Sequence, residues 1–92
     1  MLKINFKEFK IKVSFNSNEY VSSDLRESFA DLIYTKSMGF RGLKLAEKIY
    51  QSEGEIELDE KDEELFFMVV DEICTPQIVD AIYNIKEQQK NS

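Results

Sequence analysis

The stretch GEIELDEKDEELFFMVV, residues 54–70, decides the fold because a dense acidic run meets a dense apolar run with no spacer. Asp59 is well placed to cap the N-terminus of a helix, and the carboxylates after it lie in the first turn, where the helix dipole favours negative charge. Leu65 and Ile73 lie on one face at helical spacing, although LFFMVV taken alone could also be a buried strand. The flanks therefore predict a helix over residues 59–74.

The apolar part of this helix is too wide for one narrow stripe. Phe66 and Phe67 are adjacent, so their side chains point roughly 100° apart on a helix, and Met68 widens the apolar arc further. Such a helix is either central in its own core or covered by another chain, because a small domain has difficulty surrounding a helix on every side. The second reading predicts an interaction surface formed by Phe66, Phe67, Met68, Tyr34, Phe40 and Tyr50.

The N-terminal segment LKINFKEFKIKVSF alternates apolar and polar residues, but the apolar positions change from even to odd numbers at Lys7 and Glu8. Because a strand keeps its two faces only while the period of two holds, this slip predicts a tight turn or a bulge. We interpret residues 1–16 as a β-hairpin. Its polar positions carry lysines, which also protect an exposed sheet edge from pairing: Lys3, Lys7, Lys10 and Lys12.

The other helices are predicted from their end signals. Asp24, or a serine before it, is placed to cap a helix, and Gly39 can end that helix by adopting the left-handed conformation. Thr75 followed by Pro76 is a signal for the start of the last helix. The expected helices cover residues 23–37, 40–52, 59–74 and 75–88, and a frayed tail covers residues 89–92.

Length and composition predict a single α+β domain over residues 1–92, with a short N-terminal β-hairpin followed by about four α-helices that form a small helical domain. The chain is 42% apolar and 33% charged, as is typical of soluble globular proteins. The longest apolar run, Leu65 to Val70, is too short to cross a bilayer, and charges interrupt the N-terminus, unlike a signal peptide. We therefore expect a cytoplasmic protein without membrane contact.

Catalytic and metal-binding patterns have little support. The chain has no histidine, so a Cys–His or Ser–His pair is impossible, and its single cysteine, Cys74, fits a small buried hydrophobe better than a zinc ligand. An EF-hand loop starting at Glu53 would place Leu58 where the turn requires glycine. We therefore predict no catalytic, cofactor-binding or metal-binding residue, no cofactor and no enzyme activity.

The acidic run has two further readings. The net charge of −6 argues against direct nucleic-acid binding, which requires lysine and arginine to displace phosphate counterions. The carboxylates either form a solvated face that caps the helix, or they mimic phosphates and inhibit a DNA-binding protein of the host. This predicted acidic face consists of Glu57, Asp59, Glu60, Asp62 and Glu63.

The segment GLKLAEKIYQSEGEIELDEKDEELFFMVVDEI, residues 42–73, resembles a group of very small proteins encoded in bacteriophages and prophages, and the similarity covers roughly residues 25–85. The resemblance implies a setting, the cytoplasm of a bacterium that carries a mobile element, rather than a chemistry. The matching positions are Leu43, Leu45, Ala46, Ile49 and Tyr50 in the middle helix, Gly54, Ile56, Leu58 and Asp59 in the connection, and Leu65 and Val69 in the last apolar face.

Together these patterns favour a non-enzymatic protein-interaction or self-assembling module of phage or mobile-element origin. Its partner would be a second copy, in a homo-oligomer, or another protein. The alternative hypothesis is an acidic inhibitor or nucleic-acid mimic that acts on a DNA-binding protein of the host. A small enzyme is the third and least supported class, since no catalytic constellation is visible.

Overall fold

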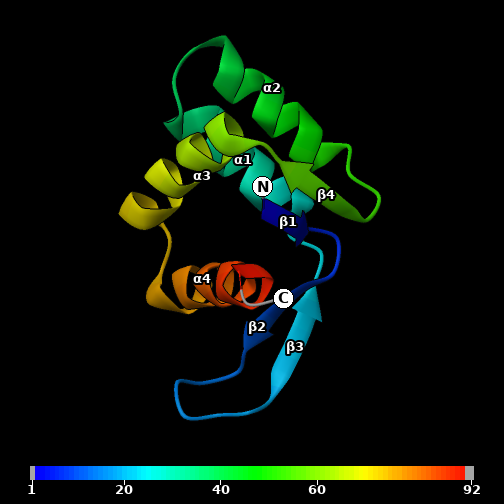
Figure 1. The fold of residues 1–92 in the computed structure, drawn as a ribbon, viewed down its shortest axis with the longest axis vertical. Coiled ribbons are helices and arrows are strands. Elements are labelled where there is room, and N and C mark those ends of the chain that lie inside the picture. Colours follow the sequence, from blue (N-terminus) through cyan, green and yellow to red (C-terminus); the bar gives the residue numbers. More distant parts are fainter. Residues whose placement is uncertain (1, 91–92) are drawn as a thin grey trace.

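The computed structural model describes residues 2–90, which form four short strands and four helices in an α+β arrangement (Figure 1). The predicted fold class is confirmed, with a β-hairpin near the N-terminus followed by helices. Residues 1, 91 and 92 lie outside the described residues. In chain order the elements are β1 (Leu2–Asn5), β2 (Phe9–Lys12), β3 (Tyr20–Ser23), α1 (Arg26–Lys36), α2 (Gly39–Tyr50), β4 (Glu55–Leu58), α3 (Glu60–Ile73) and α4 (Pro76–Lys90).

The strands form two separate two-stranded sheets, and this corrects the expected hairpin of residues 1–16. β1 pairs with β4 in antiparallel fashion, with Leu2 opposite Leu58. β2 pairs with β3, also antiparallel, with Phe9 opposite Ser23. The hairpin therefore spans residues 9–23. The segments before α1 and before α3, in which the sequence predicts no strand, supply β3 and β4, because pairing with a distant strand outweighs weak local preference.

The expected turn at Lys7 and Glu8 is present, but it leads the chain from one sheet to the other. The side-chain oxygen of Asn5 accepts hydrogen bonds from the backbone N–H groups of Lys7 and Glu8, at 3.0 Å each. The carbonyl of Phe6 accepts a 2.8 Å hydrogen bond from the N–H of Leu25, which ties this turn to the start of α1. The change from even to odd apolar positions thus marks the turn between β1 and β2, but it does not show which strand β1 or β2 pairs with.

The helices begin and end close to the expected positions because their end signals act locally. Asp59 accepts a 2.8 Å hydrogen bond from the backbone N–H of Asp62, as a helix cap does. Gly39 has a φ of +77°, the left-handed conformation that glycine adopts without strain, but it is the first residue of α2. Its predicted role as the end of the preceding helix is wrong, because α1 already ends at Lys36 with Ser37 in an extended conformation. The cap position of α1 is Leu25 rather than Asp24, whose carboxylate instead accepts a 3.2 Å hydrogen bond from the N–H of Arg26.

The predicted fraying of residues 89–92 is wrong for residues 89 and 90, because α4 continues to Lys90. The side-chain amide of Gln89 donates a 2.6 Å hydrogen bond to the backbone carbonyl of Lys3 and accepts a 2.9 Å hydrogen bond from the backbone N–H of Lys3. These two bonds join the end of α4 to the edge of β1. Residues 91 and 92 of the expected tail lie outside the described part of the chain.

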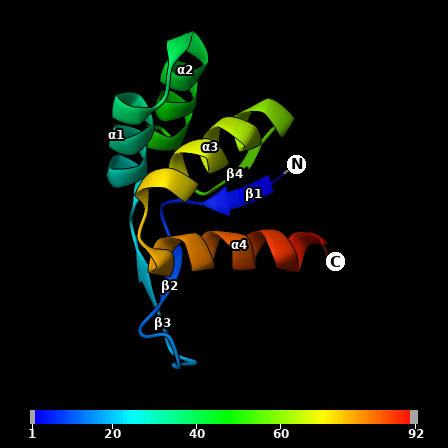
Figure 2. The same ribbon diagram turned by 90° about the vertical axis from the view of Figure 1, so that its left-hand side faces the viewer.

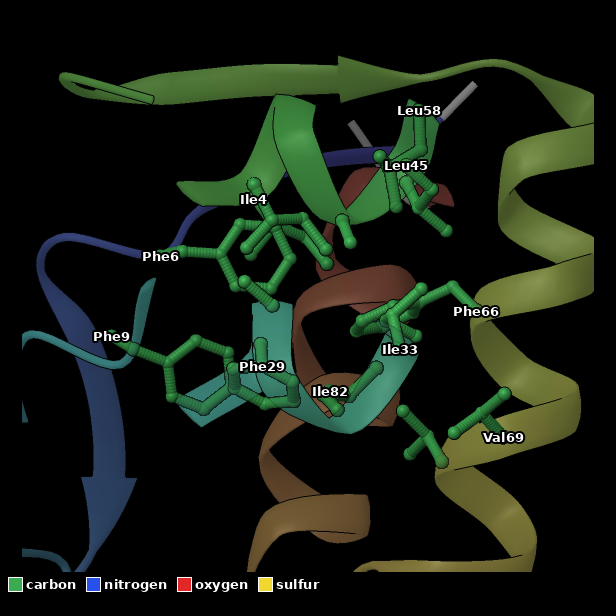
Figure 3. Packing of buried hydrophobic residues seen from close by; sticks show 14 of the residues in the cluster. Ile4, Phe6, Phe9, Phe29, Ile33, Leu45, Leu58, Phe66, Val69 and Ile82 are labelled. Carbon is green, nitrogen blue, oxygen red and sulfur yellow. The ribbon is translucent and has the colours of Figure 1, made fainter. Parts of the chain in front are cut away.

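The helices pack around the small sheets so that α1 and α2 lie side by side, α3 crosses next to them, and α4 runs beneath β1 and contacts β2 (Figure 2). The side chains that meet between these elements form one buried cluster (Figure 3). Phe66 of α3 has no exposed surface, and its ring centre lies 5.7 Å from both Phe6 and Phe29. Phe9 extends the aromatic group, 5.3 Å from Phe29. Thus α3 is a central helix of its own core.

Replacing Phe66 with alanine should lower the free energy of unfolding by about 3–5 kcal/mol, because the change leaves a cavity between rings contributed by several elements. Urea denaturation followed by circular dichroism measures the change. Met68→Ala is the matched control on the same helix; its side chain is 63% exposed, so the expected change is within about 0.5 kcal/mol. Similar losses in the two variants would contradict the central position of Phe66.

Candidate protein-interaction surface

The expected surface on α3 is not continuous. Phe66 is fully buried, so its assignment to an interaction surface is wrong. Phe67 is half-buried against α4, where its ring centre lies 5.0 Å from that of Tyr83 and 4.7 Å from the amine of Lys86. Met68 is exposed. Because α4 folds back beside α3, the wide apolar arc is covered mostly from within the chain.

The other three predicted residues lie on the paired helices α1 and α2. Tyr34 of α1 is 66% exposed, and Phe40 and Tyr50 of α2 are 71% and 61% exposed. Met38, in the turn between these helices, and Leu43 of α2 are also exposed. We call these five residues the outer face of α1 and α2: Tyr34, Met38, Phe40, Leu43 and Tyr50.

The outer face arises from the way in which the two helices pack. Each contributes a buried alanine, Ala30 from α1 and Ala46 from α2, which allows the helices to approach closely. One turn further along each helix, on nearly the same face, Ile33 and Ile49 point into the core with no exposed surface. The larger side chains between these positions are left outside, where they line a shallow groove of about 230 Å³. The groove is lined by Ala30, Asp31, Tyr34, Leu43, Ala46, Glu47, Tyr50 and Gln51.

Most of the predicted acidic face is neutralised by cations of the same chain. Asp62 lies 3.7 Å from both Arg41 and Lys48, and Arg41 also reaches Asp59 at 3.5 Å. On the other side of α3, Glu63 pairs with the amine of Lys86 at 3.1 Å. Within residues 2–90 no ion pair involves the remaining two members, Glu57 and Glu60. The run therefore presents a weaker and more divided negative field than its sequence indicates.

The cap of α3 also sets the acidity of Asp59. The hydrogen bond from the N–H of Asp62 holds the pKa of the Asp59 carboxyl below its usual value, and the positive charge of Arg41 lowers it further. A carboxyl with a lowered pKa in the folded state stabilises the fold at pH values above its unfolded pKa of about 3.9. This contribution is lost as the pH falls through the lower, folded-state pKa.

We therefore expect Asp59→Ala to lower the thermal unfolding midpoint by a few degrees at pH 7, and the difference from the unmodified chain to shrink as the pH falls below about 3.9. Asp59→Asn is the control, because asparagine caps helices well without titrating. Differential scanning calorimetry between pH 2 and pH 7 measures the unfolding midpoints of both variants and of the unmodified chain. A difference that stays constant over this range would contradict the lowered pKa.

Within residues 2–90 every buried side-chain nitrogen or oxygen atom has a hydrogen-bond partner. Arg26 binds Asp24 at 2.8 Å and the carbonyl of Ser52 at 2.8 Å, which ties α1 to the end of α2. Burial raises the pKa of the Cys74 thiol, so this thiol stays protonated at neutral pH. Residues 2–90 contain no cluster of three or more cysteine or carboxylate ligands placed to hold a metal ion. No helix in that range is long and apolar enough to span a membrane.

Several exposed apolar residues were missed as surface candidates. Leu43 belongs to the apolar stripe of its helix in the sequence, yet it lies at the rim of the α1–α2 contact. The hairpin also exposes apolar side chains: Val13, Phe15, Tyr20 and Val21. Val13 and Phe15 continue the alternation of β2, as one face of a buried strand would. Alternation identifies the two faces of a strand but does not show whether anything covers them.

Comparisons with protein-family models, with curated proteins and with solved structures found no match to this chain. The functional argument therefore rests on the exposed side chains, the groove and the charges of the described residues.

Proposed function

We propose that this chain is a non-enzymatic protein-interaction module that binds a helix of a partner protein on the outer face of α1 and α2. The observation that carries the proposal is the grouping of Tyr34, Phe40 and Tyr50, each more than 60% exposed, on two adjacent helices. Aromatic side chains are enriched in the centres of protein interfaces, and large exposed apolar patches are rare on monomers. The placement of these residues on rigid helices favours a preformed surface.

The shape of the surface favours a helix as the occupant. The groove runs between α1 and α2, with the small side chains of Ala30 and Ala46 between the larger Tyr34, Leu43 and Tyr50. A third helix can place a ridge of its own side chains into such a groove, as helices do when they pack together. Binding in this mode uses apolar anchors spaced three and four residues apart on the partner.

The charges around the groove favour a partner helix with basic flanks. Asp31 and Glu47 line the groove, and the chain carries a net charge of −6. Lys44 lies 3.6 Å from Glu47, but both side chains are exposed, so this pair contributes little. A basic flank would speed association and fix the orientation of the partner more than it would raise the affinity.

The size of the outer face is suitable for a specific contact. Each aromatic side chain buries about 150–250 Å² when it is covered, so the five residues together supply several hundred Å². A standard interface buries roughly 800 Å² on each partner, and the groove margins would supply the rest.

The acidic-mimic alternative is less well supported, because Asp59, Asp62 and Glu63 are paired with cations of the same chain. A bacterial cytoplasm and a phage origin are part of the proposal.

The test uses a synthetic amphipathic helical peptide with leucines on one face and lysines on both flanks, titrated into isotopically labelled chain. We expect saturable binding, with NMR shift changes concentrated at the outer face. A peptide with glutamates in place of the lysines should bind at least tenfold more weakly. Absence of binding by the lysine peptide, or shift changes centred on other elements, would overturn the proposal.

A double variant, Tyr34→Ser with Tyr50→Ser, should weaken peptide binding at least tenfold while leaving the circular dichroism spectrum unchanged, because both side chains are exposed. Met68→Ser is the matched control, since Met68 is equally exposed but lies on α3. Equal effects of the double variant and the control would show that binding depends on general apolar exposure rather than on the outer face.

A further inference from the structure

One edge of the β2–β3 ribbon is open. β2 pairs with β3 on one side and packs against α4 on the other, where the side-chain amide of Gln77 donates a 2.7 Å hydrogen bond to the carbonyl of Lys12. β3 has β2 as its only strand neighbour among residues 2–90. The ribbon projects away from the helices, so the outer edge of β3 faces solvent (Figure 1).

The hydrogen-bond pattern shows which backbone groups are available. The N–H of Val13 donates to the carbonyl of Glu19 at 3.0 Å, so residues 13 and 19 form a hydrogen-bonded pair of the ladder. Along an antiparallel strand the backbone N–H and C=O groups of successive residues point to alternate sides. Because Glu19 faces β2, the N–H and C=O groups of Val21 and Ser23 also point towards β2. Those of Tyr20 and Ser22 therefore point outwards, and each residue presents one donor and one acceptor.

This edge lacks the usual protection against strand pairing. Sheet edges are normally guarded by charged side chains, proline or bulges, but Tyr20–Ser23 contains no charged residue and no proline. The nearby lysines, Lys10 and Lys12, are on β2, the strand whose other side is covered by α4. Val21 is 52% exposed on the edge strand itself.

We propose that β3 pairs with β3 of a second copy of this chain, in antiparallel fashion around a twofold axis at Val21. Tyr20 of each copy then lies opposite Ser22 of the other, and the outward N–H and C=O groups form four backbone hydrogen bonds between the copies. The two ribbons become one four-stranded sheet in the order β2, β3, β3, β2. Isolated two-stranded ribbons are marginally stable, so this addition also stabilises the hairpin.

The occupant is a second copy because the edge complements itself in this register. Val21 meets Val21 of the second copy, and Ile11 lies next to Val21 within each ribbon. This makes an apolar row across all four strands. Glu19 lies opposite Ser23 of the second copy, so no like charges face each other directly, a condition that cross-strand pairing requires.

The proposed dimer contact is independent of the partner-binding face. The outer face of α1 and α2 lies near one end of the long axis, and the tip of the β2–β3 hairpin lies at the other (Figure 1). A dimer formed through β3 therefore leaves both outer faces free. The two proposals can fail separately, because Tyr34→Ser with Tyr50→Ser should leave dimer formation unchanged.

Cysteine cross-linking tests the proposed register in a Cys74→Ser background, which removes the only native thiol. Side chains directly opposite each other at a non-hydrogen-bonded position have Cβ atoms about 4.5–5.5 Å apart, close enough for a disulfide after small adjustment. Val21→Cys should form a covalent dimer under mild oxidation. Tyr20→Cys is the matched control on the same edge, and it should cross-link at least tenfold more slowly, because its opposite neighbour is Ser22. Cross-linking of the control as fast as Val21→Cys would overturn the register.

Solution mass tests the contact without new thiols. Sedimentation velocity over a range of concentrations should show a dimer for the unmodified chain. Val21→Lys should weaken the dimer at least tenfold, because two lysines would face each other across the axis. Val13→Lys carries the same added charge on the β2 side of the ribbon and should keep the dimer. A monomer at every concentration, or a dimer unaffected by Val21→Lys, would overturn the proposal.

Discussion

The contact of Phe66 with Phe6 and Phe29 is the interaction on which the rest of the structure depends. Phe66 belongs to α3, Phe29 to α1, and Phe6 to the turn after β1, so one aromatic group holds three distant parts of the chain together. A chain of 92 residues has little room for a second core. Once these rings occupy the centre, the remaining apolar side chains must be covered by α4 or stay on the outside.

The proposed surfaces follow from this arrangement. Helices α1 and α2 give Ile33 and Ile49 to the core, and the tyrosine that follows each of them, about 100° further around the helix, stays exposed. The β2–β3 ribbon is held through Phe9 and α4, which leaves β3 beyond the reach of the helices. The acidic run, prominent in the sequence, serves first to cap α3 and to join it to α2 and α4 through ion pairs. The two apolar regions therefore carry the functional proposal better than the charges do.

The sequence predicted one surface for six residues, centred on the helix that carries Phe66, Phe67 and Met68. The structure buries Phe66 and places the exposed Tyr34, Phe40 and Tyr50 on α1 and α2 instead. A wide apolar arc on a helix shows that much covering is needed, but it does not show whether the cover comes from the same chain. Here α4 returns beside α3 and covers Phe67, a contact between residues that are separated by a turn and another helix start.

What the sequence by itself determined is the set of helices and the places where they begin and end. The Asp59 cap and the Pro76 start act through hydrogen bonds and sterics within a few residues, so local sequence is sufficient. Only the tertiary structure decided the strand partners. The pairing of β1 with β4 joins the two ends of a long segment, and its register depends on which side chains the common core can enclose. Alternation in the sequence is compatible with several partners, and packing around Phe66 selects one of them.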